Sequence, residues 1–161
     1  MIFMNQNMAT ELGKRKLLSN KKKSDSIIKD IVENTILKND CLLYDKDKKI
    51  QKSSISSLWI KENFFDFINY EATINEIRYG KSFFSNVNIF YLVDKLSYEL
   101  ETKFRRKLVL YLSLHDSDVD IRFHTLRTTE NDWLDSNLDS YDNPIMCRKQ
   151  LMPSEKKRIG Y

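Results

Sequence analysis

The chain contains two histidines that could support acid–base or metal chemistry: His115 adjoins Asp116, and His124 follows Asp120 by four residues. His115 and Asp116 form an HD dipeptide, a pair that metal phosphohydrolases use. Such a site needs three or four ligands, and the other His and Asp ligands are missing from the sequence. We therefore interpret HD as an exposed pair in a turn.

His124 belongs to a second polar group, together with Tyr111, Asp120 and Arg122. A histidine near an arginine and a tyrosine could cleave RNA by general acid–base catalysis. The alternative is a solvated sheet face with ordinary cross-strand polar contacts. We favour the alternative because a catalytic base also needs a geometry that spacing does not define. The sequence has no GxSxG, HExxH, Walker or GxGxxG motif.

Residues 116–142 combine many acids with two large aromatic residues. Loops on a rigid sheet concentrate binding residues, Trp and Tyr are frequent anchors, and carboxylates attract a basic partner. The pattern predicts these partner-binding residues: Asp116, Asp118, Asp132, Trp133, Asp135, Asp139, Tyr141 and Asp142. Alternatively, Trp133, Leu134 and Leu138 attach the loop to the core. Both interpretations can hold if the apolar residues face inward and the acids outward.

A basic stretch lies at the other end of the chain, from Lys14 to Lys23, with six Lys or Arg and no acid. It could bind the phosphates of a nucleic acid. It lacks interleaved aromatic residues and zinc-ligand spacing, so a solubilising helix face is the favoured interpretation.

The element that positions these groups is a predicted β-hairpin over residues 107–127. Apolar and polar residues alternate on both sides of a short HDSD connection, which is typical of a hairpin. An apolar face fixes the register. It places Leu114 opposite Val119, Leu112 opposite Ile121, Leu110 opposite Phe123, Leu108 opposite Thr125, Tyr111 opposite Arg122 and Val109 opposite His124.

The remaining pattern predicts helices over residues 10–38, 58–70 and 86–104, and strands over 41–44 and 145–148. Residues 71–85 are ambiguous and could be a short helix broken at Gly80. Residues 128–142 read as a long loop, and 1–9 and 150–161 as flexible tails. We expect a single α+β domain over residues 1–161, with helices in the N-terminal two-thirds packed on a small antiparallel sheet built around the hairpin.

The composition, with 41% apolar and 31% charged residues, is typical of a folded domain. No apolar run is long enough to span a membrane, so we expect a soluble, cytoplasmic protein. Cys41 and Cys147 lie far apart without CxxC spacing, which favours two free thiols in apolar surroundings. We expect no metal or cofactor.

One stretch, preceded by a leucine-rich strand, carries a resemblance: DIRFHTLRTTENDWLDSNLDSYDNPIMC. From Leu108 to Cys147 the chain resembles the C-terminal part of small bacterial immunity proteins encoded beside polymorphic toxins. The resemblance implies a soluble α+β inhibitor without turnover. Such a protein would block a cognate, basic toxin domain, often a nuclease, with an acidic surface.

Overall fold

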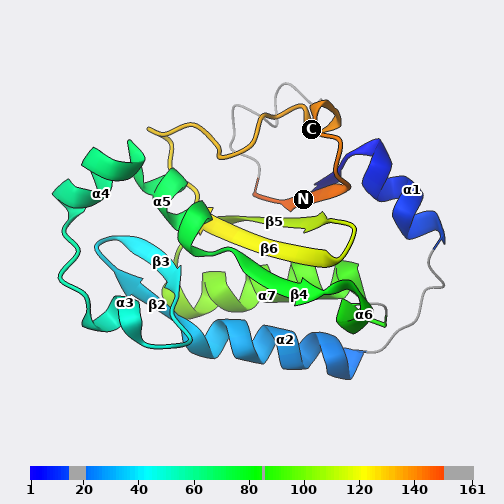
Figure 1. Cartoon of the computed structure of the whole chain (residues 1–161), viewed down its shortest axis with the longest axis horizontal. Coiled ribbons are helices and arrows are strands. Elements are labelled where there is room, and N and C mark those ends of the chain that lie inside the picture. Colours follow the sequence, from blue (N-terminus) through cyan, green and yellow to red (C-terminus); the bar gives the residue numbers. More distant parts are fainter. Residues whose placement is uncertain (15–20, 85, 151–161) are drawn as a thin grey trace.

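The computed structural model describes residues 1–14, 21–84 and 86–150, and it has the predicted α+β class. In this part of the chain, five strands form one antiparallel sheet (Figure 1). Their spatial order is β1 (Ile2–Met4), β7 (Ile145–Arg148), β5 (Leu108–Leu114), β6 (Asp118–Thr125) and β4 (Ile77–Gly80). A smaller two-stranded sheet pairs β2 (Thr35–Lys38) with β3 (Cys41–Tyr44).

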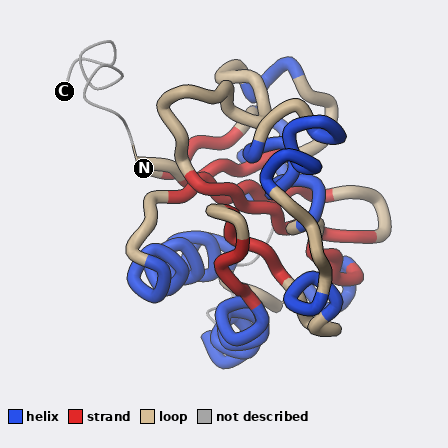
Figure 2. The backbone as a smooth tube through the Cα atoms, turned by 90° about the vertical axis from the view of Figure 1, so that its left-hand side faces the viewer, coloured by secondary structure: helices blue, strands red, loops and turns tan. Residues whose placement is uncertain are grey.

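The β5–β6 hairpin is the centre of the larger sheet, and its predicted register is confirmed at each position. Leu112 lies opposite Ile121, and both are fully buried. Helices α2 (Lys21–Asn34) and α7 (Ile89–Phe104) cover this apolar face. Figure 1 shows both helices below the sheet, and Figure 2 shows them nearly end-on. The main core therefore lies between two helices and the leucine face of the hairpin.

Helix α7 confirms the predicted helix over residues 86–104. Its apolar residues recur at helical spacing, and Leu92, Leu96 and Leu100 are fully buried. Asn88 caps the first turn, because its side chain accepts a hydrogen bond from the Tyr91 N–H at 3.0 Å.

The single helix predicted over residues 10–38 is wrong. The described chain has α1 (Gln6–Lys14) and α2, and residues 15–20 lie outside the described part. The chain leaves α2 at Asn34 and enters β2. Asn39 and Asp40, with φ of 50° and 65°, form the two-residue turn between β2 and β3. Asn and Asp tolerate the positive φ that such a hairpin turn requires. The predicted strand over residues 41–44 is confirmed as β3.

The helix predicted over residues 58–70 is two helices, α4 (Ser57–Phe64) and α5 (Phe67–Ile74). The break lies at Asp66, which is the N-cap of α5: its carboxylate accepts a hydrogen bond from the Asn69 N–H at 2.7 Å. The ambiguous segment contains the end of α5, then β4 and the short helix α6 (Lys81–Phe84). A four-residue helix, α3 (Lys49–Lys52), follows β3. Gly80 ends a strand and not a helix.

The second face of the sheet is covered by the long loop over residues 128–142, which we name the acidic loop. It includes a short 3-10 turn, η1 (Leu138–Ser140). Val109, Tyr111 and Cys147 on this face pack against apolar residues from the N-terminus and the loop: Phe3, Leu126, Trp133, Leu134 and Leu138. The predicted strand over residues 145–148 is confirmed as β7. The loop is therefore part of the fold's second layer.

The expectation of a flexible tail over residues 1–9 is wrong. Strand β1 pairs with β7, with Phe3 opposite Cys147, and α1 begins at Gln6. This pairing satisfies backbone groups that a tail would leave to water. Most of the other predicted tail, residues 151–161, lies outside the described residues. None of the described helices is both long enough and apolar enough to cross a membrane.

Candidate functional site

Asn5 holds the acidic loop in one conformation. It is 1% exposed, and its side-chain amide donates to the carbonyl oxygens of Leu138 and Tyr141, each at 3.3 Å, and of Asn143, at 2.8 Å. Its Oδ1 accepts from the N–H groups of Met8 and Ile145 at 2.9 and 3.0 Å. Asn5 thus ties the loop to the N-terminal segment. Sequence reasoning missed Asn5 because it lies in the segment expected to be a tail.

The two aromatic residues predicted as partner anchors make contacts within the fold. The Trp133 ring lies 5.6 Å from that of Tyr111, edge to face, and the Arg122 guanidinium lies 4.9 Å from the Trp133 centroid. The Tyr141 hydroxyl accepts a hydrogen bond from the Asp135 N–H at 2.9 Å. Both residues are half-buried. These contacts fit the interpretation in which apolar residues attach the loop to the sheet.

The six predicted aspartates differ in their contacts. Two bind distant parts of the fold: Asp132 pairs with Lys149 at 3.1 Å, and Asp139, itself exposed, accepts from the Gln6 N–H at 2.8 Å. Two bind residues near them in the chain: Asp118 accepts from the Ser117 hydroxyl at 2.9 Å, and Asp135 from the Asn137 N–H at 2.8 Å. The remaining two, Asp116 and Asp142, are exposed.

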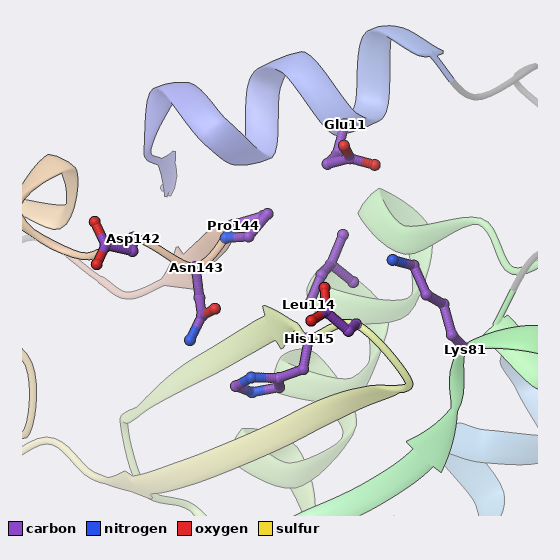
Figure 3. Close-up of a pocket in the computed structure, with 8 residues that line it drawn as sticks. Glu11, Lys81, Leu114, His115, Asp142, Asn143 and Pro144 are labelled. Carbon is purple, nitrogen blue, oxygen red and sulfur yellow. The ribbon is translucent and has the colours of Figure 1, made fainter.

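Asp116 and Asp142 line one pocket of about 370 Å³ beside the tip of the β5–β6 hairpin. Its lining comes from α1, α6, the hairpin tip and the loop before β7: Glu11, Lys81, Leu114, His115, Asp116, Asp142, Asn143 and Pro144. Figure 3 shows Glu11 and Lys81 pointing toward the same space from opposite sides. Three carboxylates against one ammonium make the pocket formally acidic. No group of three metal-ligating side chains is placed to hold an ion in residues 1–14, 21–84 and 86–150.

His115 pairs with Asp120 across the hairpin end and not with the adjacent Asp116. Its Nε2 lies 3.2 Å from Asp120 Oδ2, and Asp120 is only 5% exposed. Arg78 Nε lies 3.4 Å from the other carboxylate oxygen of Asp120, and Arg122 pairs with Glu76 beside them. His115 therefore belongs to a charged network at the β4 edge of the sheet.

The solvated face expected for Tyr111, Asp120, Arg122 and His124 is wrong. The four residues do share a face, as the register predicted, but the loop packs on it and the Arg122 guanidinium donates to the Ala72 carbonyl of α5 at 3.0 Å. Tyr111 is 3% exposed and His124 is fully buried. The prediction failed because the acidic loop covers this face, and the alternation of residues in the hairpin does not show where the loop lies.

His124 is buried without full hydrogen bonding. Its Nδ1–H donates to the Thr125 carbonyl oxygen at 3.0 Å, and Nε2 has no hydrogen-bond partner. Burial lowers the pKa of His124 below its ordinary value. An RNA-cleaving site needs a base that the substrate can reach, and the His124 ring is enclosed in this structure.

A buried ion pair joins the two sheets, and no sequence pattern predicted it. Glu71 is fully buried and pairs with Arg127. Its carboxylate also accepts from the N–H and hydroxyl of Thr125, at 2.9 and 2.8 Å, and from the Leu42 N–H in β3 at 2.5 Å. The pair therefore fixes the start of the acidic loop to the smaller sheet. Glu71 was hidden because its segment had no clear period.

The predicted basic stretch lies mostly outside the described residues. Of its ends, Lys14 pairs with Glu11 at 2.9 Å, and the Lys21 ammonium lies 5.3 Å from the Tyr91 ring. Nucleic-acid binding through Lys14 to Lys23 stays a prediction.

Both cysteines are buried, as expected, and burial raises the pKa of each thiol to about 12.

The fold and surface define an α+β domain that presents an acidic surface built from a fixed loop and a hairpin tip. Residues 3–155 match the model of the uncharacterized protein PM0498 family, and the chain belongs to that family. No curated protein and no solved structure matches the chain.

Proposed function

We propose that the protein is a non-enzymatic inhibitor of the immunity type, which binds and neutralises a cognate basic toxin domain. Nucleases are the expected class of toxin, and the cytoplasm is the expected place of action. The observation that supports this proposal best is the convergence of two separate acidic segments. Asp116 from the hairpin tip and Asp142 from the loop line one pocket, where Glu11, paired with Lys14 at 2.9 Å, adds a third carboxylate.

The fixed loop supports a binding role. The Asn5 amide donates three hydrogen bonds to loop carbonyls, its Oδ1 accepts one from the Ile145 N–H, and Trp133 packs on Tyr111, so the loop is held to the rest of the fold. A preordered surface loses less conformational entropy on association, so more of the contact energy appears as affinity.

The exposed carboxylates would act mainly on the association rate. Long-range attraction between an acidic surface and a basic partner speeds encounter, and salt screens it over about 8–10 Å at physiological ionic strength. Salt should therefore slow association more than it changes dissociation.

The proposal is tested by expressing, one at a time, the products of the genes adjacent to this one in its genome. We expect one product to arrest growth and co-expression of this chain to restore it. The variant Asp116→Lys/Asp142→Lys should lose the protection. The matched variant Asp47→Lys/Asp94→Lys, whose two carboxylate side chains are 70% and 71% exposed elsewhere, should keep it.

Two outcomes would overturn the proposal. One is that no adjacent product is both toxic and neutralised. The other is that the purified chain cleaves RNA and the His124→Ala variant does not, which would establish the enzymatic alternative.

A further inference from the structure

Three large apolar side chains are exposed on helix α4 and on the residue that follows it. Leu58 is 67% exposed, Trp59 42% and Phe65 90%. We name these three residues the α4 patch. Scattered exposed apolar residues are ordinary, but large ones gathered on one short segment mark a contact surface. Trp and Phe are also the residue types that interface cores favour.

Phe65 has an unfavourable backbone as well as an exposed ring. Its φ of 65° and ψ of −41°, with a hydrogen bond from the Asp66 N–H to the Phe64 carbonyl at 2.8 Å, define a γ-turn of the rare, strained form. Glycine adopts positive φ without the steric cost that Phe meets. The fold thus keeps at this position a residue that neither packs in the core nor suits the turn.

Packing in the fold accounts for only part of the α4 patch. In α4 itself, Ile60 is fully buried and Phe64 is half-buried, where its ring meets Tyr70 at 5.0 Å. These two residues attach the helix to the smaller core. The Trp59 ring packs on Phe64 at 5.9 Å yet stays 42% exposed, and the side chains of Leu58 and Phe65 are more exposed still.

The α4 patch borders acidic groups that continue into the loop. Asp66 and Glu130 both cap α5: Asp66 accepts from the Asn69 N–H at 2.7 Å, and Glu130 from the Ile68 N–H at 3.0 Å. Glu62 is exposed on α4. Two cations lie over the neighbouring Phe67 ring, the Lys61 ammonium at 5.5 Å and the Arg127 guanidinium at 5.4 Å, and Arg127 is already paired with the buried Glu71. Figure 1 shows α4 at the end of the molecule where the acidic loop leaves β6.

We propose that the α4 patch is the apolar anchor of the inhibitor surface, with Phe65 inserting into an apolar recess of the same basic toxin domain. The inference rests on the proposed function and adds a second contact region to it. The acidic border fits a basic partner, and the continuity through Glu130 places the patch beside the loop. Carboxylates then attract the toxin, and the aromatic side chains hold it.

The decisive variant is Phe65→Gly, measured for both stability and binding. Glycine suits the positive φ, so unfolding in urea should show equal or higher stability. The dissociation constant for the toxic neighbouring-gene product, measured by titration calorimetry, should rise about 30-fold or more, as for a central interface residue. Trp59→Ala should weaken binding in the same direction. The control is Phe90→Ala, an aromatic side chain 40% exposed on α7, which should leave binding unchanged.

The two proposals fail in different ways. If no neighbouring product is neutralised, the proposed function fails and this inference falls with it. If a product is neutralised but Phe65→Gly and Trp59→Ala bind it as tightly as the wild type, only the α4 patch is excluded. A wild-type dimer in sedimentation equilibrium that Phe65→Gly converts to a monomer would assign the patch to a second copy of this chain and would also overturn the inference.

Discussion

The side-chain amide of Asn5 donates a hydrogen bond to the carbonyl oxygen of Asn143 at 2.8 Å and so connects the first turn of the chain to the loop before β7. The same amide reaches Leu138 and Tyr141. One buried side chain thus fixes the C-terminal half of the acidic surface. The N-terminal segment is therefore needed for the shape of that surface.

The first prediction concerns Asn5→Ala. The variant leaves buried backbone groups without partners, so the free energy of unfolding in urea should fall by about 2–3 kcal/mol. Hydrogen exchange should also speed up in residues 138–145. The control is Asn7→Ala, since Asn7 is exposed and makes one bond to the loop, to the Asp142 carbonyl. Equal stability of Asn5→Ala and the wild type would show that the loop does not depend on Asn5.

The second prediction concerns the Glu71–Arg127 pair. Arg127→Met leaves a carboxylate uncompensated in the interior, where breaking an ion pair costs about 3–5 kcal/mol of stability. Adding Glu71→Gln removes the unpaired charge and should recover part of that loss. Lys29→Met, which removes an ion pair with Glu33 whose two side chains are 73% and 63% exposed, is the control and should unfold almost like the wild type. A double variant less stable than Arg127→Met alone would contradict this account.

The third prediction concerns pH. Burial lowers the pKa of His124, so the folded state binds fewer protons than the unfolded state just below the ordinary histidine value of about 6.5. Stability should fall as the pH drops from about 6.5 toward 5, by up to about 1.4 kcal/mol per unit. His124→Phe should remove this part of the slope in urea unfolding at each pH. Parallel slopes for the two proteins would refute the assignment to His124.

Much of the fold followed from the sequence where a clear period met a buried face. Alternation in the hairpin fixed its register because a shift by one residue would expose the leucine face. Helix α7 followed in the same way. The spacing of apolar residues did not show where two of the helices end. The helix predicted to residue 38 ends at Asn34, and Asn39-Asp40, with positive φ, turn the chain from β2 into β3. The helix predicted over residues 58–70 is interrupted at Asp66, which caps a new helix. Asn and Asp are the residue types that favour such turns and caps, so both breaks have a signal in the sequence.

The candidate site was harder to predict because long-range contacts define it. Asp116 and Asp142 were recognised as acids on loops, but only the fold brings them to one pocket with Glu11. Asp132, Asp139 and Trp133 were predicted to bind a partner from their residue types, but they make contacts within the fold. Phe65 lies inside the helix predicted over residues 58–70, and the γ-turn that interrupts this helix places its side chain in solvent.

The acidic surface is central to the proposed function, and stopped-flow measurement of the association rate tests its role most directly. With the neighbouring toxic protein as partner, the association rate of the wild type should fall about tenfold or more between low and physiological salt. Asp116→Lys/Asp142→Lys should be slow at low salt and nearly insensitive to salt, while Asp47→Lys/Asp94→Lys should behave like the wild type. Equal rates and equal salt dependence for the two double variants would contradict the central claim.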